Sequence, residues 1–241
     1  MVEAAFIERI DILTRIPTAY LYYLFLVIFV VFITIAIVVR ENKKALRADK
    51  IVGRGLPSYE FEAFTFVFVL LIFLYAVSSF ISSYTEVYSL LIPEYFDHWY
   101  ELFCFENIQT MEEYFREQDK SSERFKMSGY LRNLTFLLNV SFAFIGGIYS
   151  LYLGLQKPEF GENGIYGKNK TLDWEEIEDY HWKGPSVDTK GEKYNLVLTH
   201  TSVSKIQRLY TLEDKFICTI YSEDKEKIDE LLQRKVSKSG V

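Results

Sequence analysis

The sequence predicts an α-helical membrane protein with three transmembrane helices, followed by a small α+β domain. The first observation is a set of three uncharged, largely apolar stretches, at about 18–39, 63–85 and 133–156. A helix needs about 20 apolar residues to cross a hydrocarbon core of about 30 Å, and each stretch reaches that length. The second observation is a change at Lys157, after which short alternating segments are separated by glycine-containing turns. The predicted parts are an amphipathic segment at 1–17, a membrane domain at 18–156 and a separate domain at 157–241.

Composition excludes several classes of protein. The formal net charge of -6 argues against nucleic acid as a partner, because phosphate backbones select basic surfaces. The two cysteines, Cys104 and Cys218, are far apart in the chain, so we expect neither a disulfide framework nor a paired thiol site. We expect no cofactor, and the bilayer itself is the first predicted partner.

The distribution of basic residues predicts the orientation. The connection at 40–62 contains six Lys and Arg residues among its 23 positions, which places it in the cytoplasm by the positive-inside rule. Three spans then put the N-terminus and the acidic connection at 86–132 outside, and the domain at 157–241 inside. One group of residues opposes this orientation, because it brings positive charge close to the outer end of the third span: Lys120, Arg124, Lys126 and Arg132.

The spans contain no Asp, Glu, Lys, Arg or His, which lowers the expectation of a pump or proton relay. Their polar residues indicate helix packing. Counting inward from 85 and from 133 puts Ser79 and Asn139 at the same depth, about 9 Å. We therefore expect the Asn139 side chain to hydrogen-bond to the serine cluster of the second span, with Ala143 and Gly147 continuing the contact. That cluster is Ser78, Ser79 and Ser82.

The connection at 86–132 predicts two helices, at about 94–107 and 109–124, near the membrane surface. Glu94, His98 and Glu101 would share one face of the first of them. A single His with two carboxylates is weak evidence for a metal site, since zinc sites usually show three or four convergent ligands. We expect a solvated face and no metal site.

The last third of the chain predicts short strands and one closing helix. Strands are expected near 165–166, 170–173, 178–182, 194–198, 206–212 and 216–221. A tight turn at 173–177 should insert Trp174 and Ile177 into a core, and a hairpin loop is expected at 184–191. The closing helix begins after Ser222 and buries an apolar stripe formed by Ile228, Leu231 and Leu232. We expect 157–241 to fold as an autonomous domain.

The order of these segments resembles that of a known class of domains. The order of Gly164-Ile165, then Trp174 with Ile177, then an aromatic strand, a hairpin and a helix resembles the bacterial pleckstrin-homology-like (PH-like) domains. It is most similar to an uncharacterised bacterial membrane family in which spans precede such a domain. The resemblance implies a partly open β-barrel closed by a C-terminal helix, and a place in a bacterial plasma membrane. It implies no catalytic residues, and the net charge of -2 in this region gives no reason to transfer phosphoinositide binding.

Two groups of residues in the tail have the composition of catalytic sites. One is a run of carboxylates, and the other combines histidines with serines. Neither lies in a recognisable nucleophile or metalloprotease motif, so we expect no enzyme and no catalytic residues. The residues concerned are Asp173, Glu175, Glu176, Glu178, Asp179, His181, His200, Ser202 and Ser204.

The expected function is that of a membrane-anchored adaptor or sensor without catalysis, whose cytoplasmic domain binds a protein partner or a second copy of the chain. Two alternatives stay open. One is a small transport or channel component gated by the tail, and the other is a membrane-bound enzyme acting on lipid.

Overall fold

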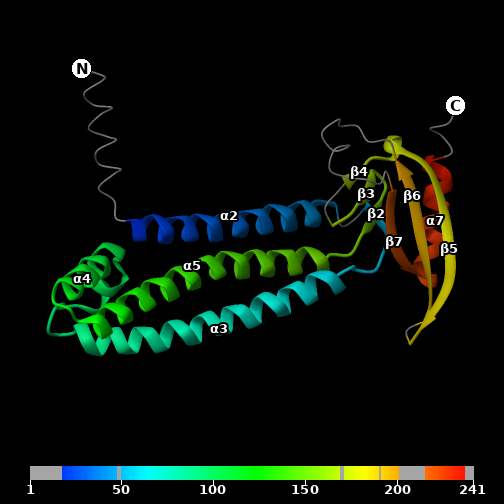
Figure 1. Ribbon diagram of the computed structural model, residues 1–241. Coiled ribbons are helices and arrows are strands. Elements are labelled where there is room, and N and C mark those ends of the chain that lie inside the picture. Colours follow the sequence, from blue (N-terminus) through cyan, green and yellow to red (C-terminus); the bar gives the residue numbers. More distant parts are fainter. Residues whose placement is uncertain (1–17, 48–49, 169–170, 190, 201–214, 237–241) are drawn as a thin grey trace, which may run out of the picture. The chain divides into compact units, whose positions relative to one another are not determined.

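The computed structural model describes residues 18–47, 50–168, 171–189, 191–200 and 215–236 (Figure 1). The expected amphipathic segment at 1–17 and the expected strand at 206–212 lie outside these residues. The described chain forms two compact units, one within 1–36 and 65–148 and the other within 37–64 and 149–241.

Three long helices confirm the prediction of helices apolar enough to cross a membrane. They are α2 (Thr18–Arg47), α3 (Glu60–Leu91) and α5 (Ser121–Leu155). All three continue beyond the uncharged stretches. At 1.5 Å per residue the 32 residues of α3 extend about 48 Å, more than the hydrocarbon core of a bilayer requires.

The connection between α3 and α5 differs from its prediction. The expected helix at 94–107 is wrong, because Trp99–Phe103 form a short 3-10 helix (η2) and α4 starts at Phe105 and ends at Glu117. The Glu101 carboxylate accepts the His98 backbone N–H at 3.0 Å and so caps η2. Asp119, with a φ of 55°, separates α4 from α5.

This connection is part of a core in the first unit. Leu102 of η2 and Phe115 of α4 are fully buried with the ends of α3 and α5, and the Tyr130 hydroxyl donates to the Leu102 carbonyl oxygen at 3.0 Å. The remaining buried members of this core are Val87, Leu91, Phe105, Ile108, Met111, Met127, Leu134 and Leu138. A segment too short for a core of its own therefore builds one with the helix ends.

The pairing of α3 with α5 also differs from its prediction. The Asn133 side-chain N–H donates to the Ser79 carbonyl oxygen at 3.2 Å, whereas Asn139 is exposed on the helix surface. The expected bond from Asn139 was wrong because it assumed that the helices share a boundary at 85 and 133. Both helices extend past those positions, which shifts the register by six residues.

The second unit contains two antiparallel sheets and a final helix. One sheet has the order β1-β2-β3-β4, and the other β5-β6-β7. The strands are β1 (Ile51–Arg54), β2 (Glu159–Gly161), β3 (Gly164–Tyr166), β4 (Thr171–Leu172), β5 (Ile177–Asp188), β6 (Gly191–His200) and β7 (Lys215–Tyr221), and the helix is α7 (Ser222–Val236). The described strands do not join into one closed barrel.

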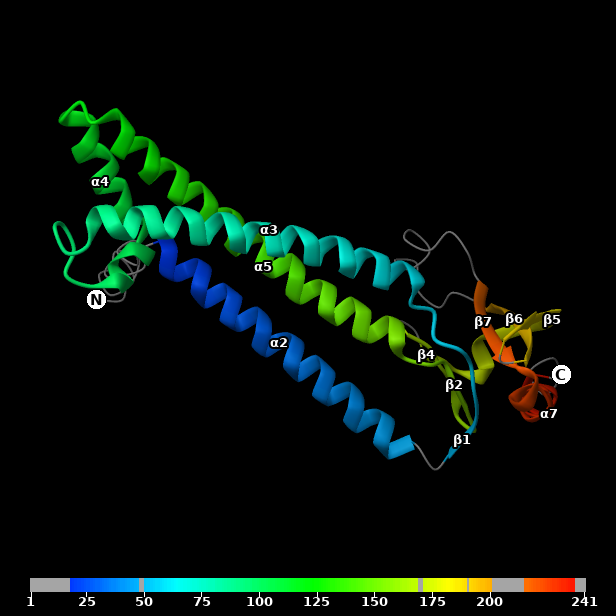
Figure 2. The same ribbon diagram turned by 90° about the horizontal axis from the view of Figure 1, so that it is seen from below.

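Strand β1 comes from the connection between α2 and α3, and the sequence did not predict it. Its residues pair with β2, and Figure 2 shows the two strands side by side. Backbone bonds from Gly55 to the Pro158 oxygen (2.8 Å) and from Leu56 to the Thr219 oxygen (2.7 Å) continue this attachment. The connection at 40–62 is therefore part of the C-terminal fold.

The core of this unit confirms several predictions. Trp174 and Ile177 are buried beside the 3-10 helix η3 (Trp174–Glu176). The predicted stripe of α7 (Ile228, Leu231 and Leu232) is also buried. The hairpin loop expected at 184–191 is wrong, because β5 continues to Asp188, which pairs with Gly191. The ladder instead shifts register between Lys183 and Ser186, around a cis peptide bond before Pro185.

Candidate functional site

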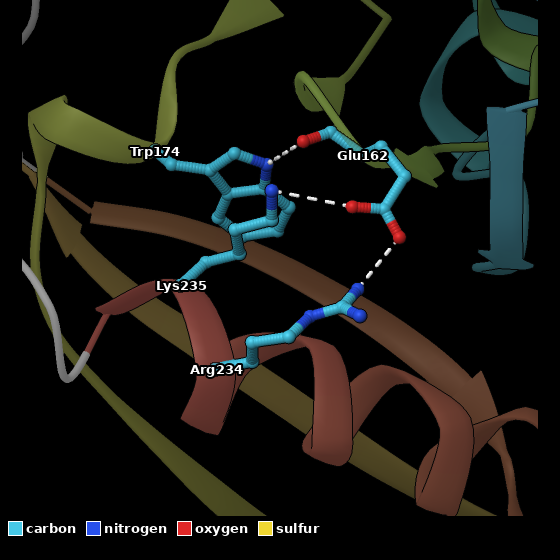
Figure 3. A network of polar contacts seen from close by, with 4 residues as sticks. All are labelled: Glu162, Trp174, Arg234 and Lys235. Carbon is cyan, nitrogen blue, oxygen red and sulfur yellow. Dashed lines mark hydrogen bonds and ion pairs between the residues drawn. The ribbon is translucent and has the colours of Figure 1, made fainter.

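A polar network joins the β2–β3 turn to the end of α7 (Figure 3). The Glu162 carboxylate accepts hydrogen bonds from Arg234 at 2.6 Å and from Lys235 at 3.2 Å. Its backbone oxygen accepts the indole N–H of Trp174 at 3.1 Å. The lysine and arginine beside Glu162 lower the pKa of its carboxyl group, so it is ionised at neutral pH.

A groove of about 390 Å³ lies next to this network, between β1 and α7. Its described lining combines charges of both signs with two apolar side chains: Val52, Glu162, Lys227, Glu230, Leu231 and Arg234. Charged groups around an apolar centre are suited to recognition of a polypeptide, whereas this lining contains no hydroxyl, thiol or imidazole for nucleophilic chemistry.

A polar junction connects the helix ends of the second unit to the loop between β3 and β4. Arg40 of α2 donates to the Gly167 carbonyl oxygen at 3.4 Å, and Lys168 forms an ion pair with Glu62 of α3. Gly154 of α5 fits against Glu62, because a Cβ at this position would lie 3.1 Å from the Glu62 side chain. The loop therefore contacts α2 and α3 directly, and Glu62 in turn contacts α5.

A second part of the junction connects α2 to α5. Glu41 accepts hydrogen bonds from the Tyr152 hydroxyl and from Gln156, and Lys44 donates to the Gln156 oxygen at 3.0 Å. The ends of the three long helices thus share a layer of paired polar side chains with the C-terminal fold.

The carboxylates considered for catalysis bind local backbone groups. Glu176 accepts the Asp173 backbone N–H at 3.2 Å in a capping box around η3, and Asp179 accepts the N–H of Tyr180 at 2.8 Å. Such bonds stabilise a turn and a strand start, and they do not point two carboxylates at one reacting atom. Glu175 and Glu178 are exposed on neighbouring elements.

The two histidines considered for catalysis, His181 and His200, occupy different positions in the sheet. His200 is buried and pairs with Ile177 across the sheet, whereas His181 is exposed and pairs with Val197. Ser202 and Ser204 lie outside the described residues. In the acidic connection, Glu101 caps η2, and no group of three His, Cys, Asp or Glu side chains within the described ranges could hold a metal ion.

Strand β1 was not predicted, because the charged residues of 40–62 are typical of a connection. The available signal was the short apolar segment Ile51-Val52-Gly53 between charged residues. Gly53 packs closely there, since a Cβ at this position would lie 2.7 Å from the Ile228 side chain of α7.

Comparison with known proteins places a family match on the second unit. A model described as "Domain of unknown function (DUF5673)" matches residues 156–237. Searches of curated proteins and of solved structures found no match. The chain therefore combines three helices able to cross a membrane with a DUF5673 domain, which the structure supplements with β1.

Proposed function

We propose that this chain is a membrane-anchored adaptor or sensor without catalytic activity, whose DUF5673 domain binds a protein partner at the cytoplasmic face of a bacterial plasma membrane. The observation that supports it best is β1. A strand from the connection between two long helices is hydrogen-bonded into the domain, so a change in the spacing of α2 and α3 reaches the sheet directly.

The polar junction supports the sensor part of the proposal. Arg40 and Glu62 hold the β3–β4 loop through its Gly167 and Lys168, and they belong to different helices. A shift of one helix would break one of these contacts and leave the other. Contacts that respond separately to two helices provide a way to convert a small helix movement into a change of a domain surface.

Two further observations support the finer parts of the proposal. Sheets of four and three antiparallel strands followed by a helix are compatible with a PH-like architecture. The pairing of β1 with β2 supports a location of 40–62 and the domain on one side of the membrane, and the Lys and Arg content of 40–62 favours the cytoplasmic side.

The experiment is site-specific photo-crosslinking of the full chain in native membranes. A photoreactive residue at Lys227 or Glu230, both exposed and lining the groove between β1 and α7, should give one discrete adduct with a protein partner or with a second copy. The Gly53→Leu substitution disturbs the contact of β1 with α7 and should abolish the adduct. Gly146→Leu, on α5 where a Cβ meets nothing within 4 Å, should preserve it. No adduct, together with solute flux or lipid turnover by the reconstituted protein, would refute the proposal.

A further inference from the structure

The first unit contains a polar groove of about 830 Å³ between α3 and the N-terminal part of α5. On the α3 side its walls carry four serines and Glu86. On the α5 side they carry Lys126, Arg132 and Asn133. Gly129 of α5 leaves the groove open, because a Cβ built there has no atom within 4 Å.

The groove brings polar atoms deep along the helix pair. Asn133 bonds to Ser79, which lies six residues, or about 9 Å, inside the end of the uncharged stretch of α3. Arg132, the neighbour of Asn133, therefore lies level with the uncharged stretch of α3, where an apolar occupant would leave its charge without compensation.

The charge of the groove favours an anion. Among the ion pairs found within the described residues, none involves Lys126 or Arg132, although both line the groove. Ser121 and Ser122 bring the N-terminus of α5 to the same groove, where the helix dipole attracts negative charge. Serine hydroxyls and an arginine are typical donors to phosphate oxygens.

The face of α3 that lines the groove changes from polar to apolar along its length. Ser78, Ser82 and Glu86 follow each other at helical spacing, and the same face continues through Tyr75 to Leu71, which are 67% and 60% exposed. Tyr75 contacts Phe136 of α5 edge to face, with ring centroids 6.4 Å apart. A polar site that continues into an exposed apolar strip fits an amphiphile better than a free ion.

We propose that this groove binds the phosphate of a phospholipid headgroup, with Arg132 and Lys126 as its cationic partners and the acyl chains along the apolar face of α3. Glu86, at the level of Lys126, completes the groove with a negative charge suited to a headgroup donor such as a glycerol hydroxyl or an ammonium group.

The test measures lipid binding to the full chain in detergent by native mass spectrometry. Dioleoyl-phosphatidylglycerol is compared with dioleoylglycerol, which has the same acyl chains without the phosphate. We expect a discrete bound phosphatidylglycerol and at least about tenfold weaker binding of dioleoylglycerol, since charge-assisted hydrogen bonds are lost. Equal binding of the two would overturn the proposal. Inorganic phosphate that competes at the same concentration as the lipid would also overturn it, in favour of a free anion.

Matched variants locate the site. Arg132→Gln should weaken phosphatidylglycerol binding about tenfold, whereas Arg124→Gln removes the same charge from the same helix outside the groove and should change it less than about twofold. Gly129→Leu should fill the groove and abolish binding. Gly146→Leu adds the same side chain to open space elsewhere on α5 and should have no effect. Equal losses in a variant and its control would refute the location.

Discussion

Glu162 shows how one carboxylate couples a turn to a helix. Replacing it in Glu162→Gln removes two ion pairs with α7, at a site where the carboxylate is 44% exposed. We expect the free energy of unfolding to fall by less than about 1 kcal/mol at neutral pH, because exposed pairs contribute little.

The difference in stability between Glu162→Gln and the unchanged protein should become smaller at low pH. The pKa of Glu162 is lowered in the folded state, so its contribution is present above the ordinary pKa of 4.5 and is lost as the pH falls through the lowered value. Thermal unfolding of both proteins between pH 3 and 7 should therefore show midpoints that converge in acid. A constant difference across this range would mean that the ionised carboxylate is not the cause.

Gly53 lets β1 pack closely against α7, because glycine has no side chain. In Gly53→Ala the new Cβ would lie 2.7 Å from the Ile228 side chain, so this side chain, β1 or α7 must shift. We expect a loss of about 1–3 kcal/mol, the usual cost of overpacking. Gly129→Ala, at a helical position with open space, should be neutral or stabilising by up to about 1 kcal/mol. Chemical denaturation measures both, and equal stabilities would contradict the contact.

At the scale of elements, β1 changes the expected boundary of the C-terminal domain. A fragment of residues 157–241 lacks Arg54, which pairs at 3.5 Å with the buried Glu159, and leaves the edge of β2 uncovered. The loss of the β1–β2 pairing and of the Arg54 ion pair should make this fragment unfold at a lower temperature than one in which residues 49–56 precede it through a short Gly-Ser linker. Gly53→Leu in the longer fragment should remove the gain. Equal midpoints for the two fragments would show that β1 does not stabilise the domain.

The register of α3 against α5 is a second property of elements. Cysteines at Ser79 and Asn133, in a chain without Cys104, should be linked efficiently by a short bifunctional maleimide, because the Asn133 side chain reaches the Ser79 backbone. Cysteines at Ser79 and Asn139 should not, since residue 139 lies about 9 Å further along the helix. Electrophoresis separates these outcomes, and preferential linking of the second pair would restore the register expected from the uncharged stretches.

At the scale of the whole molecule, the proposed orientation predicts a pattern of labelling. Single cysteines replace Ser58, Ser121 or Ser186, all exposed, in a chain with Cys104 changed to alanine. Burial raises the pKa of the Cys218 thiol to about 12, so that thiol should stay unreactive. An impermeant maleimide added to intact cells should label only the Ser121 position, and membrane disruption should expose the other two. Labelling of the Ser58 and Ser186 positions in intact cells would invert the orientation.

The features that could be predicted from the sequence are those that depend on neighbouring residues. Uncharged length defined α2, α3 and α5, and local periodicity identified the buried stripe of α7 and the insertion of Trp174. Each of these follows from side chains within one or two helical turns or one strand, so no distant partner is needed to recognise it.

The features that could not be predicted depend on partners that lie far apart in the chain. Ile51 becomes part of a strand only because it pairs with Gly161, which lies 110 residues later in the chain. Asn133 contacts Ser79 only because both helices extend beyond their uncharged stretches. The polar groove appears for the same reason, since serines of α3 that look like packing residues face Arg132 of α5. Pairing and register are set by the sum of many contacts across the fold, and a single sequence read segment by segment does not contain that sum.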